Sequence, residues 1–337
     1  MGETISAEKS SFAGAEGTAA ADAAVRDGSG RCRKATWRDF IQMTKPGILI
    51  SNTVTAFAGF WMASGRTGAV DIPLLLYTLL GTLLVMASGC VLNNYLDRDF
   101  DARMERTRNR ALASGTVAPR TALVYGLALG AAGLSVLALF VGPLAAALGF
   151  AGWFVYVFVY TLWLKRTSVH STAVGGIAGA MPPVIGYVAV AERLDLGAWL
   201  LFLLLFLWQP PHFWALGIRR RDEYRRAGYP LLPVVRGVSE TKWAIFQYTV
   251  LLAPVSLLPY LYGYAGEFYL LAAAALGLAW AAMATAWLRS DREDDRWAKR
   301  MFVFSVYYLT IVSVVLALDT TFVRESVDVP LELERLS

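Results

Sequence analysis

Residues 73–101 read PLLLYTLLGTLLVMASGCVLNNYLDRDFD, an apolar run that ends abruptly in amides and acids. An apolar run of about 20 residues is long enough to cross a bilayer as a helix. At its end Asn93, Asp97 and Asp101 are spaced four apart, so a helix places them on one face with about 6 Å between neighbours. The stretch predicts a membrane helix whose last turns carry a polar site.

Similar apolar runs recur along the 337 residues, of which 56% are hydrophobic. Each is long enough to span the bilayer as a helix, and a spanning helix satisfies its own backbone hydrogen bonds. We therefore predict an all-α integral membrane protein with nine transmembrane helices. The predicted spans are 46–64, 73–96, 121–141, 143–163, 172–190, 198–218, 244–264, 267–288 and 300–318.

The basic residues predict the orientation of these spans. Of the 31 Lys and Arg residues, 27 fall on the amino-terminal side of the membrane, and the other side holds Arg66, Arg193, Arg324 and Arg335. Cytoplasmic segments carry such an excess of basic residues. We predict a multi-pass plasma-membrane protein with its amino terminus and charged loops in the cytoplasm and its carboxyl terminus outside. The asymmetry also accounts for the net charge of +5 without nucleic acid as a partner.

The two ends of the chain differ from the apolar middle. Residues 1–36 are rich in Ala, Gly, Ser and charged residues, a composition typical of disordered segments. We divide the chain into a disordered cytoplasmic tail (1–36), a membrane domain (37–320) and a short exterior tail (321–337).

The acids of residues 93–101 lie at a helix C-terminus, where the helix dipole makes negative charge unfavourable. A divalent cation that prefers oxygen ligands, such as Mg²⁺, would make the placement favourable. Arginines follow between Asp97 and the next span, at positions 98, 103, 106, 108, 110 and 120. Metal-binding carboxylates beside guanidinium groups at a membrane surface suggest an enzyme that acts on a lipid diphosphate.

A second charged loop follows the sixth span and repeats this chemistry. Asp222 and Glu223 lie there among arginines, close to a helix end. Two acidic clusters on equivalent helix ends are expected to face each other across one cavity, each with a metal ion.

Simpler interpretations remain open for these residues. The acids of residues 93–101 fit a solvated helix end whose charges neutralise nearby arginines. Many of the arginines fit a purely topological role, and Lys45, Lys165 and Arg166 fit either role.

His212 is the more informative of the two histidines, since His170 lies at a loop edge. It follows Pro210-Pro211, which, like Pro182-Pro183 in the fifth span, is expected to break or kink its helix. An imidazole facing a cavity there could bind a metal, hold a polar substrate group or move protons. A hydrogen bond that merely satisfies the broken helix is equally compatible.

Asn93 to Asp101, continued by Met104 to Arg110, resembles the intramembrane prenyltransferases of the UbiA superfamily. Further stretches resemble the heme-modifying branch of that superfamily, and the resemblance covers about residues 37–320. They are Thr44-Lys45-Pro46-Gly47, Tyr160 to Ser168, Gly175 to Gly186 and Gln209 to Pro233.

The sequence departs from the family in two places. Asp222-Glu223 stands where an Asp-x-x-x-Asp motif is usual, which leaves the ligands of a second metal open. Arg110-Ala111-Leu112 stands where Arg-Pro-Leu is common, a change expected to matter little.

The resemblance implies a UbiA-type helical bundle that transfers a farnesyl group with the help of Mg²⁺. Farnesyl diphosphate would donate the group to a vinyl carbon of heme b, a substrate rather than a cofactor, to give heme O on the route to the hemes of terminal oxidases. The implied partners are these two substrates, the lipid bilayer, and heme A synthase or a terminal oxidase.

The resemblance also implies a set of site residues. The implied metal ligands are Asn93, Asp97, Asp101, Asp222 and Glu223. The implied diphosphate-binding residues are Lys45, Arg106, Arg110, Lys165, Arg166 and Arg221. The implied catalytic residues are Asn93, Asp97, Asp101 and His212.

Two alternatives differ in class. A prenyltransferase of the same superfamily with an aromatic acceptor, such as 4-hydroxybenzoate, is opposed only by the motifs of the fifth and sixth spans. A cation-coupled multi-pass transporter predicts acids near the membrane midplane, whereas these acids lie at one face.

Overall fold

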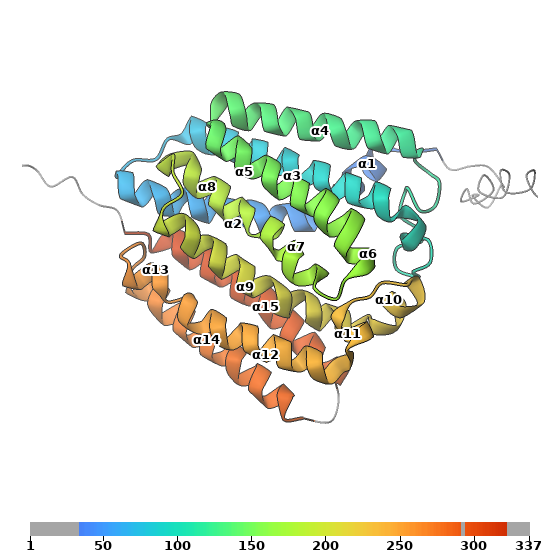
Figure 1. Cartoon of the computed structure of the whole chain (residues 1–337). Coiled ribbons are helices and arrows are strands. Elements are labelled where there is room, and N and C mark those ends of the chain that lie inside the picture. Colours follow the sequence, from blue (N-terminus) through green and yellow to red (C-terminus); the bar gives the residue numbers. More distant parts are fainter. Residues whose placement is uncertain (1–33, 291–293, 322–337) are drawn as a thin grey trace, which may run out of the picture.

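The computed structural model describes residues 34–290 and 294–321, and these form a bundle of helices (Figure 1). Within them, nine helical stretches are long and apolar enough to cross a membrane, which confirms the predicted spans. The first three are α2 (Pro46–Thr67), α3 (Ile72–Asp101) and α4 (Pro119–Phe140). The fourth joins α5 (Pro143–Phe154), η1 (Val155–Leu164) and α6 (Lys165–Thr167), and the fifth joins α7 (Ser171–Gly179) and α8 (Met181–Ala191). The last four are α9 (Leu196–Arg219), α12 (Gly237–Val255) with α13 (Leu258–Leu261), α14 (Glu267–Leu288) and α15 (Asp294–Leu318).

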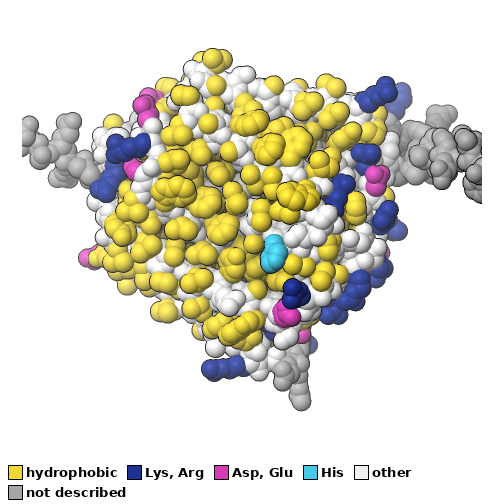
Figure 2. Space-filling view, in the orientation of Figure 1, with side chains coloured by type: hydrophobic (Ala, Val, Ile, Leu, Met, Phe, Trp, Pro, Cys, Tyr) yellow, Lys and Arg dark blue, Asp and Glu magenta, His cyan; other side chains and the backbone are white. Residues whose placement is uncertain are grey.

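Three short helices lie outside these spans: α1 (Trp37–Met43), α10 (Arg221–Ala227) and α11 (Leu232–Val235). They gather with the loop of residues 102–118 at one end of the bundle, on the right in Figure 1. Figure 2 shows a broad apolar surface across the middle of the molecule, with Lys and Arg side chains at its two ends and more of them at this one. The two predicted tails fall almost entirely outside the described residues.

Helix boundaries follow from local sequence. Proline opens α2, α4 and α5 at Pro46, Pro119 and Pro143, where its missing N–H would have no helical partner anyway. The Asp71 side chain caps α3 by accepting from the backbone N–H of Leu74 at 2.9 Å. Gly142 alone separates α5 from the C-cap of α4, so the third and fourth spans form a tight hairpin.

The spans α2 and α8 cross with their backbones in contact. A Cβ added at Gly59 of α2 would lie 2.0 Å from the carbonyl oxygen of Pro183, and one at Gly186 of α8 would lie 2.0 Å from that of Ala56. Small residues allow this close approach in membrane bundles, where van der Waals packing contributes to helix association. The crossing joins the first part of the chain to the fifth span.

The two proline pairs have different effects. The fifth span divides into α7 and α8 at Ala180, next to Pro182-Pro183, as predicted. At Pro210-Pro211, where a break or a kink was predicted, α9 continues without a break through both buried prolines. The φ of proline is compatible with a helix, and the cost comes from the lost backbone hydrogen bond and from the clash of the ring with the preceding turn. In membrane bundles, packing against neighbouring helices makes this cost tolerable.

Candidate active site

The last turns of α3 present the acids to the interior. Asn93, Asp97 and Asp101 are 3%, 1% and 3% exposed, whereas the Asp99 side chain is 70% exposed. The helical spacing therefore puts the first three on the buried face, as predicted. Their burial excludes the interpretation of a solvated helix end.

Asp97 is the centre of a buried network. Its Oδ2 accepts hydrogen bonds from Lys165 Nζ at 2.5 Å and from Asn93 Nδ2 at 2.9 Å. Arg166 Nη2 lies 3.8 Å from Oδ1 and donates to the backbone oxygen of Leu96 at 2.6 Å. Oδ1 itself is buried without a hydrogen-bond partner among the described residues. A buried carboxylate oxygen left in this way is costly, which indicates that a further ligand belongs there.

Lys45 enters the network from the start of α2. Its backbone is left-handed (φ 56°, ψ 67°), a conformation that costs a non-glycine residue about 1–2 kcal/mol. Its Nζ donates to Asn93 Oδ1, and burial lowers its pKa to about 8. A strained, half-buried lysine aimed at an acidic cluster is typical of a functional site.

The fourth span supplies a wide turn to the same network. Residues 155–164 form a π-helix, a rare backbone form that is frequent at functional sites. Within it the hydroxyl of Thr161 donates to the carbonyl oxygen of Tyr156 at 2.8 Å and accepts from Asn93 Nδ2 at 3.1 Å. Lys165 follows at the end of this segment, so the wide turn places both side chains against α3.

Asp101 is held by the loop that follows it. Arg110 Nη1 donates to Asp101 Oδ2 at 2.7 Å and lies 3.4 Å from Asn94 Oδ1. The Thr107 hydroxyl donates to the backbone oxygen of Asp101 at 2.8 Å. The predicted diphosphate ligand Arg110 is thus folded back onto the acid row.

Aromatic residues cover the network from the side of α10 and α11. The Tyr229 ring stacks on Phe100 with centroids 4.7 Å apart, and Lys165 Nζ lies 4.9 Å from the centroid of the same ring. The guanidinium of Arg166 lies 4.9 Å from the Phe100 ring. Burial raises the pKa of Tyr229, and the nearby Asp97 carboxylate raises it further.

The second acidic motif is arranged differently from the prediction. Asp222 is exposed and pairs with Arg225 at 3.2 Å and with Arg221 at 3.7 Å, and Glu223 pairs with Arg220 at 3.2 Å. Across the described ranges, no three His, Cys, Asp or Glu side chains come together in a way that could hold a metal. Arginines of the same loop pair with these acids in this structure, and a second metal site at Asp222 and Glu223 stays a prediction.

Arg106 and His212 also lie apart from the buried network. Arg106 is exposed in the loop after α3. The His212 ring stacks between Trp208 and Phe302, with centroids 4.7 Å and 4.6 Å away, and its Nδ1 lies 2.7 Å from Ser305 Oγ of α15. The structure therefore assigns His212 to the contact between α9 and α15.

Three contributors to the site are not among the predicted site residues: Asn94, Thr161 and Tyr229. Asn94 Nδ2 donates to the backbone oxygen of Met43 at 2.9 Å, which ties α1 to α3. Thr161 could have been found as the single aliphatic hydroxyl in an aromatic run, four residues before Lys165. Tyr229 carries no local signal, because its place depends on how the loop folds back.

Known proteins resemble this chain over nearly its whole membrane domain. The model of the UbiA prenyltransferase family matches residues 52–306. Protoheme IX farnesyltransferase 1 of Bacillus subtilis is 47% identical over 295 residues, which cover 85% of this chain and 92% of the relative. Protoheme IX farnesyltransferase of Acinetobacter baylyi is 45% identical and is covered over 99% of its length, against 87% of this chain.

Solved structures share the fold at lower identity. A digeranylgeranylglyceryl phosphate synthase superposes with a TM-score of 0.71 at 18% identity, covering 85% of this chain and 99% of that one. A UbiA homologue from Archaeoglobus fulgidus, bound to GPP and Mg²⁺, superposes with a TM-score of 0.59 at 13% identity, covering 83% and 99%. By its matched domain and by its extent of identity, the chain belongs to the UbiA prenyltransferase family.

Proposed function

We propose that this protein transfers the farnesyl group of farnesyl diphosphate to a vinyl group of heme b and so forms heme O. The observation that carries the proposal is the 44–47% identity to proteins named protoheme IX farnesyltransferase, which extends over most of both chains. The buried cluster of acids and cations at the end of α3 supplies chemistry that a prenyl diphosphate requires. Heme O, or heme A made from it, would then serve a terminal oxidase.

The acid row fits one divalent metal ion. Asn93 and Asp97 offer the oxygens that Mg²⁺ prefers, and buried Asp97 Oδ1 has no hydrogen-bond partner among the described residues. Asp101 extends the same face one turn further. A bound Mg²⁺ would neutralise negative charge on the diphosphate, and the Archaeoglobus fulgidus homologue binds Mg²⁺ together with a prenyl diphosphate. Asp222 and Glu223 would need to leave their arginines to hold a second ion.

The basic residues around the acid row would bind the diphosphate. Lys45, Lys165 and Arg166 lie within the network, and charge-assisted hydrogen bonds from such groups to phosphate are strong. Arg110 approaches from the loop, and the exposed Arg106 and Arg221 complete the proposed set. These cations stabilise the leaving diphosphate as its bond to the first farnesyl carbon breaks, because they are held in place before the reaction.

The allylic cation left by this cleavage must meet the vinyl group before water does. The aromatic rings of Tyr229 and Phe100 cover the cations next to the cleavage point, and they limit the access of water there. The vinyl π electrons then form the new carbon–carbon bond, and water adds to the resulting heme cation with release of a proton. The products are the hydroxyethylfarnesyl side chain and diphosphate.

His212 is proposed to contact the heme. The Ser305 hydroxyl donates to the Phe302 carbonyl oxygen at 2.6 Å, so the Ser305 oxygen accepts the proton on His212 Nδ1. This hydrogen bond leaves a lone pair on Nε2, the arrangement that a metal-ligating histidine needs.

Replacing His212 with alanine should weaken heme binding at least tenfold, while diphosphate binding stays within about twofold. The two affinities are measured separately on detergent-purified protein, and loss of iron ligation should also change the heme absorption spectrum. His170→Ala is the matched control, because His170 is exposed at the start of α7. Unchanged heme affinity in folded His212→Ala protein would remove His212 from the site and leave it a packing residue.

We also propose that the active-site end of the bundle faces the cytoplasm of a bacterial or archaeal cell. A reporter fused after residue 110 or 225 should then report the cytoplasm, and one fused after residue 193 the exterior. The reason is the excess of Lys and Arg at the end that holds residues 110 and 225. An exterior signal at residue 225 would reverse the topology and the placement of the site.

The acceptor is tested directly. Purified protein is incubated with farnesyl diphosphate, Mg²⁺ and either heme b or 4-hydroxybenzoate, and the products are separated by mass spectrometry. We expect farnesylated heme and no farnesylated benzoate. The reverse result would favour the aromatic-acceptor prenyltransferase. Proteoliposome flux without diphosphate release would favour a transporter, although Asp97 and Asp101 lie in the last turns of α3 and not at the middle of a span.

A further inference from the structure

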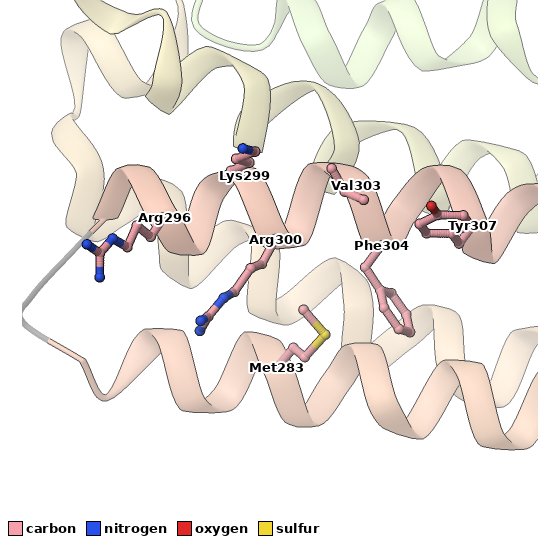
Figure 3. Close-up of a pocket in the computed structure, with 7 residues that line it drawn as sticks. All are labelled: Met283, Arg296, Lys299, Arg300, Val303, Phe304 and Tyr307. Atoms are coloured by element: carbon pink, nitrogen blue, oxygen red, sulfur yellow. The ribbon is translucent and has the colours of Figure 1, made fainter.

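A surface groove lies along α15 beside α14 (Figure 3). It is an open, shallow groove with a volume of about 510 Å³. Its apolar part is formed by Met283 of α14 and by Val303, Phe304 and Tyr307 of α15. Its other part is basic, with Arg296, Lys299 and Arg300 on the first turns of α15.

The basic part lies at the same end of the bundle as the acid row. The start of α15 is tied there by its acids, since Asp294 Oδ1 lies 2.6 Å from Lys242 Nζ, and Asp295 Oδ1 lies 3.6 Å from Arg219 Nε at the end of α9. The groove therefore has cations at one end of the membrane-spanning region and hydrocarbon side chains toward its middle.

Two of the cations are available to a ligand. The acids of the first turn of α15 pair with other helices, Asp294 with Lys242 of α12 and Asp295 with Arg219 of α9. Lys299 and Arg300 are exposed, and Arg300 contacts only the face of Trp297, at 5.3 Å from the ring centroid, in the part of the chain that the structure describes. Figure 3 shows Arg300 on the same side of α15 as Phe304, above Met283.

The groove is separate from the reaction site. Ser305, which contacts His212, and Met301 are buried on the inner face of α15. Val303 and Tyr307, by contrast, are 40% and 61% exposed on the groove side. A ligand in the groove would be in contact with the bilayer and not with the acid row.

We propose that this groove binds an anionic phospholipid. Lys299 and Arg300 bind the phosphate of the headgroup, and an acyl chain lies along Val303, Phe304 and Tyr307. The charge pattern matches this ligand, because basic groups between membrane helices attract anionic headgroups and an apolar, membrane-exposed floor suits a lipid chain. A soluble diphosphate would use the cations but not the floor.

Native mass spectrometry of the full chain in detergent, titrated with phosphatidylglycerol or phosphatidylcholine, tests the proposal. We expect one phosphatidylglycerol to be retained per chain, at least tenfold more tightly than phosphatidylcholine. Lys299→Gln with Arg300→Gln should weaken phosphatidylglycerol binding about 30-fold, at about fivefold per cation. The control is Arg120→Gln with Arg236→Gln, which removes two other exposed cations from the same end and should leave binding unchanged.

A second variant keeps the basic residues and fills the apolar part of the groove with a larger side chain. Val303→Trp should also weaken phosphatidylglycerol binding, and it decides the matter if the charge variant fails to fold. Equal retention of both lipids, or an equal loss in the control pair, would show nonspecific surface attraction and overturn the proposal. So would displacement of the lipid by glycerol phosphate at equal concentration, because the floor would then contribute nothing.

Discussion

Farnesyl transfer should fall by about 100-fold or more when Asp97 or Asp101 is replaced by alanine, the loss typical of removing one preorganised electrostatic group. Asp97 has the larger expected effect, because Lys165, Arg166 and Asn93 all converge on it. Heme O formation is measured by mass spectrometry per folded molecule. This normalisation matters, since removing one partner of a buried ion pair can itself cost about 3–5 kcal/mol.

The matched control for these variants is Asp99→Ala, on the same helix two residues from each acid. Its side chain is 70% exposed and lies 3.7 Å from Arg98, so the variant should keep most of the activity. Asp97→Asn, which keeps the shape and removes the charge, should be nearly as inactive as the alanine variant. If Asp99→Ala proved the most damaging of the three alanine variants, the assignment of the buried face as the site would fail.

Gly59→Ala should strongly reduce the folded fraction of the protein, although it adds only one methyl group. The new Cβ would lie 2.0 Å from the carbonyl oxygen of Pro183, a backbone atom that cannot rotate away as a side chain would. Overpacking in a core costs about 1–3 kcal/mol when side chains can adjust, and here α2 and α8 themselves must separate. Size-exclusion chromatography gives the folded fraction, and thermal unfolding gives the melting temperature.

Gly47→Ala is the control for this effect. Gly47 lies on the same helix, but a Cβ there would meet no atom within 4 Å. Alanine favours a helix over glycine by about 1 kcal/mol, so this variant should be at least as stable as the wild type. If the Gly59→Ala and Gly47→Ala proteins had the same melting temperature, the backbones of α2 and α8 would not be in contact at Gly59.

Features that depend on a single helix could be predicted from the sequence. The spacing of Asn93, Asp97 and Asp101 predicts a shared face directly, because the period of an α-helix is constant. Hydropathy located the nine spans for a similar reason, since the length of a span is set by the bilayer.

Arrangements that depend on how loops and helices pack against one another could not be predicted in this way. The pairing of Asp222 and Glu223 with arginines of their own loop is one example, because a charged loop has no helical period that orients its side chains. The π-helix of residues 155–164 left no mark in composition, because its apolar and aromatic residues suit an α-helix equally well. The continuation of α9 through Pro210-Pro211 depends on neighbouring helices, which proline rules for a single helix do not include.

The network around the acid row has a consequence for product release. Two carboxylates, Asp97 and Asp101, face four cations: Lys45, Lys165, Arg166 and Arg110. These side chains thus carry an excess of two positive charges, which an entering anion would balance. Free diphosphate meets this need as well as the prenylated substrate does. We infer that its departure, and not bond cleavage, limits the rate, so the first turnover should appear as a burst of heme O.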